Sequence, residues 1–266
     1  MNRHLLKSAV LGVLLLTVCA NAGLDWRLDD DDKELKFTVS GQELTEPLCI
    51  KRLYLRIDDI GYTIEGEPLS TEAVKDGFCG TWMLGDRKVK VTVTPGKNRY
   101  QIYVKPESGY KIQRMGMRLE ATEDEYFTGL MERVVDGDQD LSWEEGMTQA
   151  MDLRGENVEM KVKPSLGLYS PFYLSSRGYG LFVHGTWQGR YSFPDKGDDG
   201  SVSFYFYSPE LKVTVYTGGP LRAVKNHMAD TGPQFLPPKW AFRPWRWRDD
   251  HHHRDEYFDD SKVNAP

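Results

Sequence analysis

The 266-residue sequence predicts an all-β fold, an antiparallel β-sandwich. Between Asp25 and Gly219, short segments of alternating apolar and polar residues are separated by clusters of Gly, Pro and Asp. Alternation of this kind indicates strands that bury one face, and many short strands with frequent turns are typical of sandwiches. One helix is expected, close to the end of this region.

The first 22 residues have the features of a secretory signal peptide. Arg3 and Lys7 give a positively charged start, Ala9 to Val18 an apolar stretch, and Ala20-Asn21-Ala22 a small-residue cleavage site. The apolar stretch of about ten residues is too short to cross a membrane, which takes about 20. We therefore expect an exported protein, secreted or periplasmic, whose mature chain starts at Gly23.

The mature chain is acidic. The full sequence has 34 basic and 40 acidic residues, and removal of Arg3 and Lys7 leaves 32 against 40, a formal charge of −8. No long basic stretch is present, so we expect neither nucleic acid nor a membrane surface as a partner. The oligomeric state stays open.

Three cysteines are present, and Cys19 leaves with the signal peptide unless a lipid is attached to it. Cys49 and Cys79 remain, in a compartment that permits disulfides. We expect a bridge between them, which would close a loop of about 30 residues and stabilise the fold by about 3 kcal/mol. Two buried free thiols are the alternative.

Two hairpins are the clearest strand signals. In the first, Val89, Val91 and Val93 alternate with polar residues up to a turn at 95–98, after which Tyr100 resumes the alternation. In the second, the segment 202–207 is followed by a turn at 208–210 and a further alternating segment at 212–216. Both patterns predict antiparallel neighbours joined by tight turns.

The expected helix runs from Pro220 to Asp230. Proline suits the first helical position, and Gly232 suits the position after the end. Leu221, Val224 and Met228 form one apolar stripe, which we expect to pack against the sandwich. A linker follows to residue 238.

A second domain is expected to start at Lys239. Three Trp and one Phe occur between Trp240 and Trp247, within a predicted strand that ends at Arg248. So many large aromatic side chains need an apolar surface to pack against, and few residues follow before Pro266. We therefore expect 239–266 to be the start of a truncated domain.

Four segments carry a resemblance to a known family. They are Glu125–Arg133 with a G-x-x-E pattern, Leu168–Val183 with P-F-Y-x-S-S-x-G-Y-G, Gly218–Ala241 around the expected helix, and Tyr257–Asn264. In this order and spacing they resemble glycoside hydrolase family 31, the α-glucosidase and α-xylosidase family of retaining glycosidases. The resemblance covers roughly Tyr126 to Pro266.

The resemblance implies a mutarotase-like β-sandwich at 23–219, then a helix and linker at 220–238, then the first strand of a truncated (β/α)8 catalytic barrel at 239–266. Retaining glycosidases use two carboxyl groups about 5 Å apart. The family's nucleophile and acid/base are Asp residues on later barrel strands, so no residue of this chain receives a catalytic role. The implied function is hydrolysis of O-glycosyl bonds of α-linked sugars, by a protein of which this chain is an inactive N-terminal part.

Substrate contacts are expected at two places. A loop of the family's β domain reaches the sugar, and the matching segment here offers Asp152 and Arg154, for which an exposed charged loop is the alternative. Trp247 and Asp249 stand near the end of the expected barrel strand, where such enzymes bind substrate, although barrel core is the alternative for Trp247.

The resemblance implies no metal and no cofactor. The consecutive residues His251–His253 cannot all point at one metal ion from an extended loop. The expected partner is therefore an α-linked oligosaccharide or glycoside. The rival interpretation is a free-standing secreted β-sandwich that binds carbohydrate without cleaving it.

Overall fold

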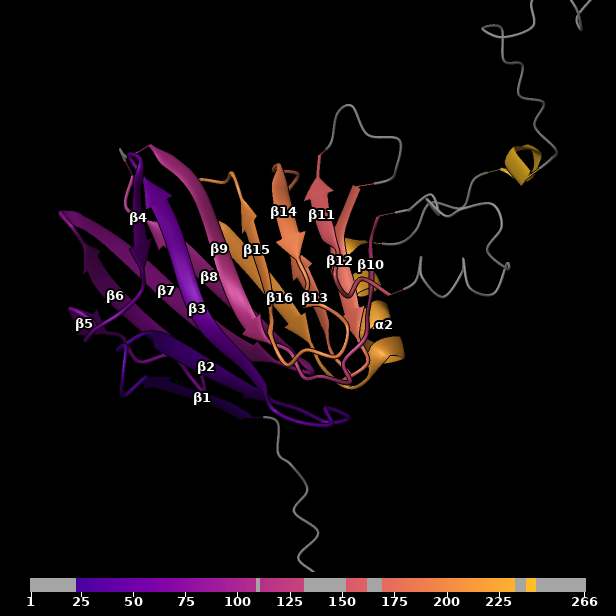
Figure 1. Ribbon diagram of the computed structural model, residues 1–266, viewed down its shortest axis with the longest axis horizontal. Helices are drawn as coiled ribbons and strands as arrows, with labels where there is room; N and C mark the ends of the chain where they lie inside the picture. Colours follow the sequence, from indigo (N-terminus) through magenta and orange to yellow (C-terminus); the bar gives the residue numbers. More distant parts are fainter. Residues whose placement is uncertain (1–22, 109–110, 132–151, 162–168, 233–237, 243–266) are drawn as a thin grey trace, which may run out of the picture. The chain divides into compact units, whose positions relative to one another are not determined.

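The computed structural model describes residues 23–108, 111–131, 152–161, 169–232 and 238–242. Its contacts divide the chain into two units, of which the first ends at Asp230 and the second begins at Thr231. Apart from one helix, the regular elements described in the first unit are antiparallel strands (Figure 1). The prediction of an all-β sandwich is confirmed.

The strands form two sheets. The first has β4 (Ile60–Thr63) paired with β3 at its side and otherwise follows the order β1 (Gly23–Leu28), β2 (Leu35–Ser40), β3 (Leu48–Ile57), β9 (Ile112–Glu120), β15 (Ser201–Phe206), β14 (Gly189–Ser192), β11 (Asn157–Met160). The second follows the order β10 (Phe127–Met131), β12 (Tyr169–Ser175), β13 (Gly180–Val183), β16 (Leu211–Tyr216), β8 (Arg99–Pro106), β7 (Arg87–Gly96), β6 (Phe78–Leu84), β5 (Ser70–Thr71).

The core lies between the two sheets and follows from the alternation in the sequence. Val89, Val91 and Val93 of β7 are fully buried in one cluster with Leu53 and Met117 of the opposite sheet. Each apolar side chain of this size contributes about 1.5–3 kcal/mol when it leaves water. The polar residues between them face outward, which fixes the register of each strand.

The first predicted hairpin is confirmed. Strands β7 and β8 pair from Val89 opposite Pro106 to Gly96 opposite Arg99. The tight turn contains Asn98 at φ 57°, in the left-handed region that Asn tolerates better than most residues.

The second predicted hairpin is wrong, although both of its strands exist. Strand β15 pairs with β9 and β14 in the first sheet, whereas β16 pairs with β8 and β13 in the second. The segment 207–210 therefore crosses from one sheet to the other. Alternation and a turn signal cannot tell such a crossing from a hairpin, because both join two half-buried strands.

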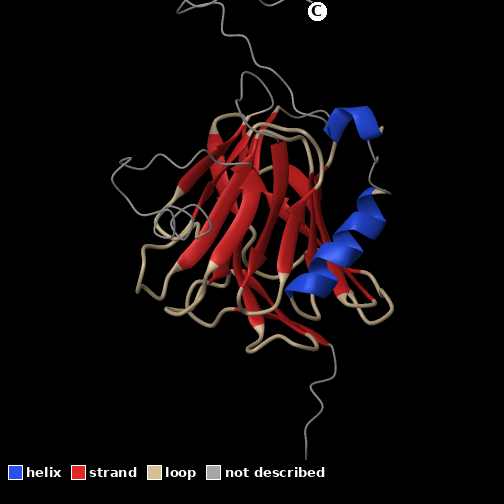
Figure 2. Ribbon diagram, turned by 90° about the vertical axis from the view of Figure 1, so that its right-hand side faces the viewer, coloured by secondary structure: helices blue, strands red, loops and turns tan. Residues whose placement is uncertain are grey.

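The predicted helix is confirmed as α2 (Pro220–Thr231), which lies along the strands of the second sheet (Figure 2). The predicted apolar stripe is wrong, since the Leu221 side chain is 89% exposed. The helix instead turns Ala223 and His227 towards the sheet, where the His227 ring stacks on Phe172 at 4.1 Å. Small and flat side chains on this face let the helix approach the sheet closely.

The predicted strand from Trp240 to Arg248 is wrong in its described part. Residues Lys239–Phe242 form a 3-10 helix, η1. The rest of the predicted strand, and all of 243–266, lies outside the described residues. The signal peptide at 1–22 lies outside them too, as do Glu132 and Arg133 at the end of the segment with the G-x-x-E pattern. The domain boundaries stay predictions.

The predicted disulfide is wrong, because both cysteines are free thiols. Cys49 lies on β3 between the core residues Leu48 and Ile50, so its side chain points out of the first sheet. Cys79 lies on β6 and its Sγ is 3.6 Å from Thr92 Oγ1, on the outer side of the second sheet. The whole sandwich separates the two sulfur atoms.

Candidate functional site

A cavity of about 400 Å³ lies where β10, the end of β12 and the start of α2 come together. Asp152 is the one carboxylate among its lining residues, so the cavity includes a residue that the sequence singled out. The other lining residues are Tyr126, Phe127, Thr128, Leu174, Ser175, Ser176 and Pro220.

Tyr126 forms one wall of the cavity in a fixed position. Its backbone N–H donates to Ser176 Oγ at 2.9 Å, and its carbonyl accepts from the Ser176 N–H, also at 2.9 Å. The Tyr126 side chain is 61% exposed. A rigid backbone with an exposed aromatic ring is suited to stacking on a flat ligand face.

Asp152 is held at the start of a short turn. Its Oδ1 accepts a hydrogen bond of 3.1 Å from the Arg154 N–H, and the Leu153 N–H donates to the Phe127 carbonyl at 2.8 Å. The second bond fastens the turn to β10. No donor from the described residues bonds to Asp152 Oδ2, so this oxygen remains able to accept from a ligand hydroxyl.

Arg154 has a different role from the one that the sequence predicted. Its side chain is buried, and its guanidinium donates to four backbone carbonyls, those of Thr122, Glu125, Asp195 and Asp198. Four of its five N–H groups are thereby used inside the domain. Arg154 therefore joins three loops behind the cavity and is not free to bind a sugar.

Below the cavity a buried carboxylate is fully engaged. Glu125 accepts from Ser175 Oγ at 2.5 Å and from the Thr122 N–H at 3.2 Å, and Arg177 Nη1 lies 3.4 Å from its Oε2. Arg177 also donates to the Pro47 carbonyl at 2.7 Å. The buried acid thus has both a counter-charge and hydrogen bonds, as a buried ion requires.

Two tyrosines next to this ion pair stay neutral at all ordinary pH values. Tyr173 and Tyr179 are fully buried, and loss of hydration raises the pKa of each phenol well above its usual value of about 10. Both side chains are fully buried, so neither hydroxyl is exposed to a ligand in the cavity. The region below the cavity is therefore structural.

The described walls of the cavity offer a hydrogen-bond acceptor and an exposed aromatic ring, but no pair of carboxylates suited to glycoside hydrolysis. Asp152 faces the cavity, whereas Glu125 is committed to Arg177. The described residues also contain no cluster of three potential metal ligands. In the same ranges no helix is long and apolar enough to cross a membrane.

The other two predicted substrate contacts, Trp247 and Asp249, lie outside the described residues and stay predictions. Glu125, Ser175 and Arg177 lie in the segments that carry the family resemblance, but the sequence predicted no function for them. Glu125 and Arg177 are charged residues in segments rich in aromatic residues, which was the available signal. A charged residue in such a segment is buried only with a partner.

No protein family model matches the sequence, and no curated protein matches it. Solved structures match the fold. A GH31 family sulfoquinovosidase from E. rectale, in complex with an aza-sugar inhibitor, is 12% identical with a TM-score of 0.56, and the match covers 81% of this chain and 35% of that chain. The chain thus spans about a third of the length of that enzyme and shares the fold of the matched part.

Two further solved structures are similar over a comparable part of the chain. A GH31 dextranase from Flavobacterium johnsoniae, complexed with glucose, is 15% identical with a TM-score of 0.38, covering 84% of this chain and 29% of that chain. A cycloalternan-forming enzyme from Listeria monocytogenes, in complex with a pentasaccharide substrate, is 19% identical with a TM-score of 0.41, covering 82% and 24%. The match to the sulfoquinovosidase confirms the expected likeness to family 31 at the level of the fold.

Proposed function

We propose that this chain is the N-terminal part of an exported retaining α-glycosidase that hydrolyses O-glycosyl bonds of α-linked sugars. Its two catalytic Asp residues are then absent from this chain, which is inactive alone. The observation that carries the proposal is the fold shared with part of a GH31 sulfoquinovosidase. Fold alone does not fix function, so the proposal also rests on the cavity beside Asp152.

The cavity beside Asp152 supports the proposal. Its walls combine one carboxylate oxygen that can accept from hydroxyls with an exposed aromatic ring, Tyr126. Sugar sites combine these two features, because a sugar has polar edges and apolar C–H faces. In this role the β domain contributes binding and orientation, and the catalytic barrel contributes the chemistry.

Export rests on the N-terminal sequence pattern. Strand β1 begins at Gly23, the residue that signal cleavage would leave first. Its carbonyl accepts a hydrogen bond of 3.0 Å from Tyr100 Oη, so this residue already belongs to the sandwich.

The intact mass of the native protein, isolated from its own source, tests the proposal. A mass far above the 30.5 kDa of this sequence supports a longer hydrolase, whose remaining residues are then sequenced for the catalytic Asp pair. A mass equal to residues 23–266 contradicts it. N-terminal sequencing of the same sample tests export, since the first residue should be Gly23.

The role of the cavity is tested in the longer enzyme, on a panel of α-linked disaccharides. Asp152→Asn and Tyr126→Ala should raise KM, with a smaller change in kcat, because both side chains would bind the sugar without joining the chemistry. Asp199→Asn removes a carboxylate from an exposed loop and is the matched control. Unchanged KM in both cavity variants would exclude this role.

A free-standing carbohydrate-binding sandwich is the second candidate. The exposed Tyr126 ring next to a cavity favours it, since sugar-binding modules use such aromatic platforms. Titration of neutral α-linked oligosaccharides into the purified chain separates the two. Saturable micromolar binding supports the module, and its absence supports the half-site of a larger enzyme.

A further inference from the structure

A second groove, of about 370 Å³, lies on the outer face of the first sheet, remote in sequence from the Asp152 cavity. Four arginines line it: Arg52 and Arg56 from β3, and Arg114 and Arg118 from β9. The chain as a whole is acidic, with a formal charge of −6. A local concentration of four guanidinium groups therefore stands out from the average surface.

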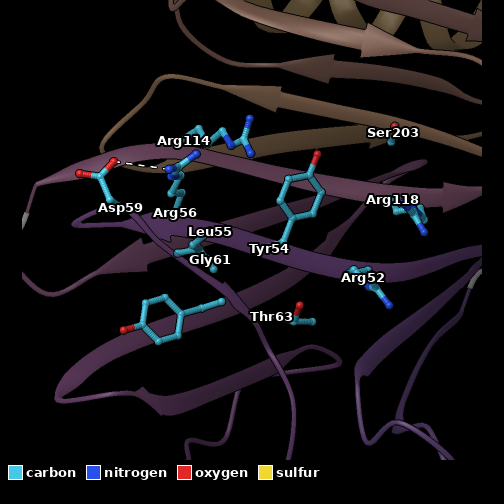
Figure 3. Close-up of a pocket in the computed structure, with 11 residues that line it drawn as sticks. Arg52, Tyr54, Leu55, Arg56, Asp59, Gly61, Thr63, Arg114, Arg118 and Ser203 are labelled. Atoms are coloured by element: carbon cyan, nitrogen blue, oxygen red, sulfur yellow. Dashed lines mark hydrogen bonds and ion pairs between the residues drawn. The ribbon is translucent and has the colours of Figure 1, made fainter.

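The strand register brings these arginines together in two rows, each of which is one cross-strand pair. Arg52 lies directly opposite Arg118, and Arg56 lies directly opposite Arg114. Figure 3 shows one pair at each end of the groove, with Tyr54 between them. Like charges directly opposite each other destabilise a sheet, so both rows cost stability in the free protein.

Tyr54 forms the floor between the two rows. It is paired with Gly116, where a Cβ atom would lie 2.4 Å from Tyr54 Cζ, so the ring lies across the glycine. Tyr54 Oη donates to the Phe204 carbonyl at 2.7 Å, which holds the ring flat on the sheet. Burial raises the pKa of Tyr54 to about 12, so the floor stays uncharged.

Two of the four arginines have a carboxylate partner in a close ion pair. Arg52 pairs with Glu34 at 2.5 Å, and Arg56 lies 3.5 Å from Asp59. Asp59 is shared, because it also accepts from Gln113 Nε2 at 2.6 Å. Asp32 and Glu65 add their negative charge near Arg52, whereas Arg114 and Arg118 form no ion pair with a described residue.

Arg114 and Arg118 line the groove, and neither forms an ion pair with a carboxylate of the described residues. Arg114 lies over the Tyr205 ring at 4.9 Å, and Arg118 has no ion pair within the described ranges. Arg56 Nε is buried without a hydrogen-bond partner there. A buried unpartnered donor costs free energy unless a ligand accepts from it.

We propose that this groove binds an acidic oligosaccharide through its carboxylate or sulfate groups. Guanidinium groups bind such oxyanions with paired hydrogen bonds, and the two arginines without an ion pair to a described residue, Arg114 and Arg118, match two anionic groups. The two arginine rows are four residues apart on β3, about 13 Å along the strand, which is too far for one small ion. Tyr54 supplies an apolar face between them for a sugar ring.

Tyr205 and Tyr207 extend the aromatic surface beyond Arg114. Their rings meet edge to face at 5.6 Å, and Tyr207 is about half exposed. Alternating aromatic and cationic groups suit a chain of sugar rings with acidic substituents. This inference is independent of the function proposed above, because it concerns another face and another ligand chemistry.

Isothermal titration at low salt tests the proposal, with tri-galacturonate and a sulfated heparin tetrasaccharide as acidic probes and maltotriose as the neutral one. We expect one or both acidic probes to bind and maltotriose not to bind at this groove. The double variant R114Q/R118Q should lose tenfold or more in affinity. The double variant K88Q/K105Q removes two exposed charges from the second sheet and should retain binding.

Absence of binding by both acidic probes would overturn the proposal, as would equal losses in the two double variants, which would indicate unspecific charge attraction. Tighter binding of single-stranded DNA than of either acidic probe would also overturn it. Thermal unfolding is the check on folding. Because R114Q/R118Q removes two like-charge contacts, its Tm without ligand should equal or exceed that of the unmodified chain.

Discussion

Arg177 and Glu125 form an ion pair in the interior of the sandwich. Arg177 Nη1 lies 3.4 Å from Glu125 Oε2, and the two side chains are only 6% and 0% exposed. Arg177 also reaches the Pro47 carbonyl before β3, and Glu125 accepts from the Thr122 N–H before β10. The pair therefore holds three chain segments together beneath the Asp152 cavity.

Glu125→Gln should lower the free energy of unfolding by about 3–5 kcal/mol. The substitution keeps the shape of the side chain but leaves the buried Arg177 without a counter-charge. Urea denaturation measures the loss. Glu72→Gln is the control, since its partner Lys90 is about half exposed and such a pair contributes no more than about 1 kcal/mol. Equal effects of the two substitutions would contradict the structural role of the buried pair.

Gly116→Ala should destabilise the chain by about 1–3 kcal/mol through overpacking. The new Cβ atom would lie 2.2 Å from the Phe204 carbonyl oxygen, which is backbone and cannot move aside. It would also displace Tyr54 from the floor of the arginine groove. Denaturant unfolding measures the change in stability, and titration with the acidic probes measures the loss of binding.

Gly61→Ala is the matched control for this change. Gly61 lines the same groove, but a Cβ atom there would meet nothing within 4 Å. Its stability should stay within about 0.5 kcal/mol of the unmodified chain. A similar loss at both glycines would mean that close packing over Gly116 is not the cause.

The sequence identified most strands, because alternation is a local signal that directly reflects burial. It could not show which sheet each strand joins. The segment 207–210 illustrates this, since Ser208 and Pro209 are as typical of a tight hairpin as of the crossing that they form. Pairing partners depend on contacts between segments far apart in the chain, which one sequence does not show.

The sequence located some residues of the candidate sites and missed the roles of others, for a similar reason. Asp152 was located through the family resemblance, and the structure places it at a cavity. The role of Arg154 depends on carbonyl groups about 30 to 44 residues away along the chain, which no local pattern contains. The alternation of Arg52, Tyr54 and Arg56 is visible in the sequence, but its pairing with Arg114 and Arg118 across about 60 residues is not.

Cys49 and Cys79 should be free thiols in the purified protein. Because Cys49 and Cys79 lie on opposite outer faces of the sandwich, a bridge would require the fold to open. Alkylation with iodoacetamide in denaturant, without reductant, should label both thiols in a mass spectrum of the purified chain. Its Tm should also be the same with and without reductant. A mass showing an intramolecular disulfide, or a lower Tm in reductant, would contradict the arrangement.

His184 should make stability depend on pH between about 6.5 and 4. Its Nε2 lies 2.8 Å from Thr214 Oγ1, and burial, followed by the charge of Lys212, lowers its pKa to about 4. In this window the unfolded chain binds a proton that the folded chain excludes, so stability falls as the pH falls. The full shift corresponds to about 3 kcal/mol. Because the side chain is partly exposed, we expect about 1 kcal/mol.

His184→Gln separates this effect from the titration of other groups. Glutamine retains a hydrogen-bonding group near Thr214 but carries no charge at any pH, so its stability should fall less between pH 7 and 5 than that of the unmodified chain. Urea denaturation of both proteins at four pH values gives the difference. His227, whose pKa burial also lowers, remains in both proteins and accounts for part of the slope that they share. Parallel pH profiles for the two proteins would show that His184 is not excluded from protonation in the folded state.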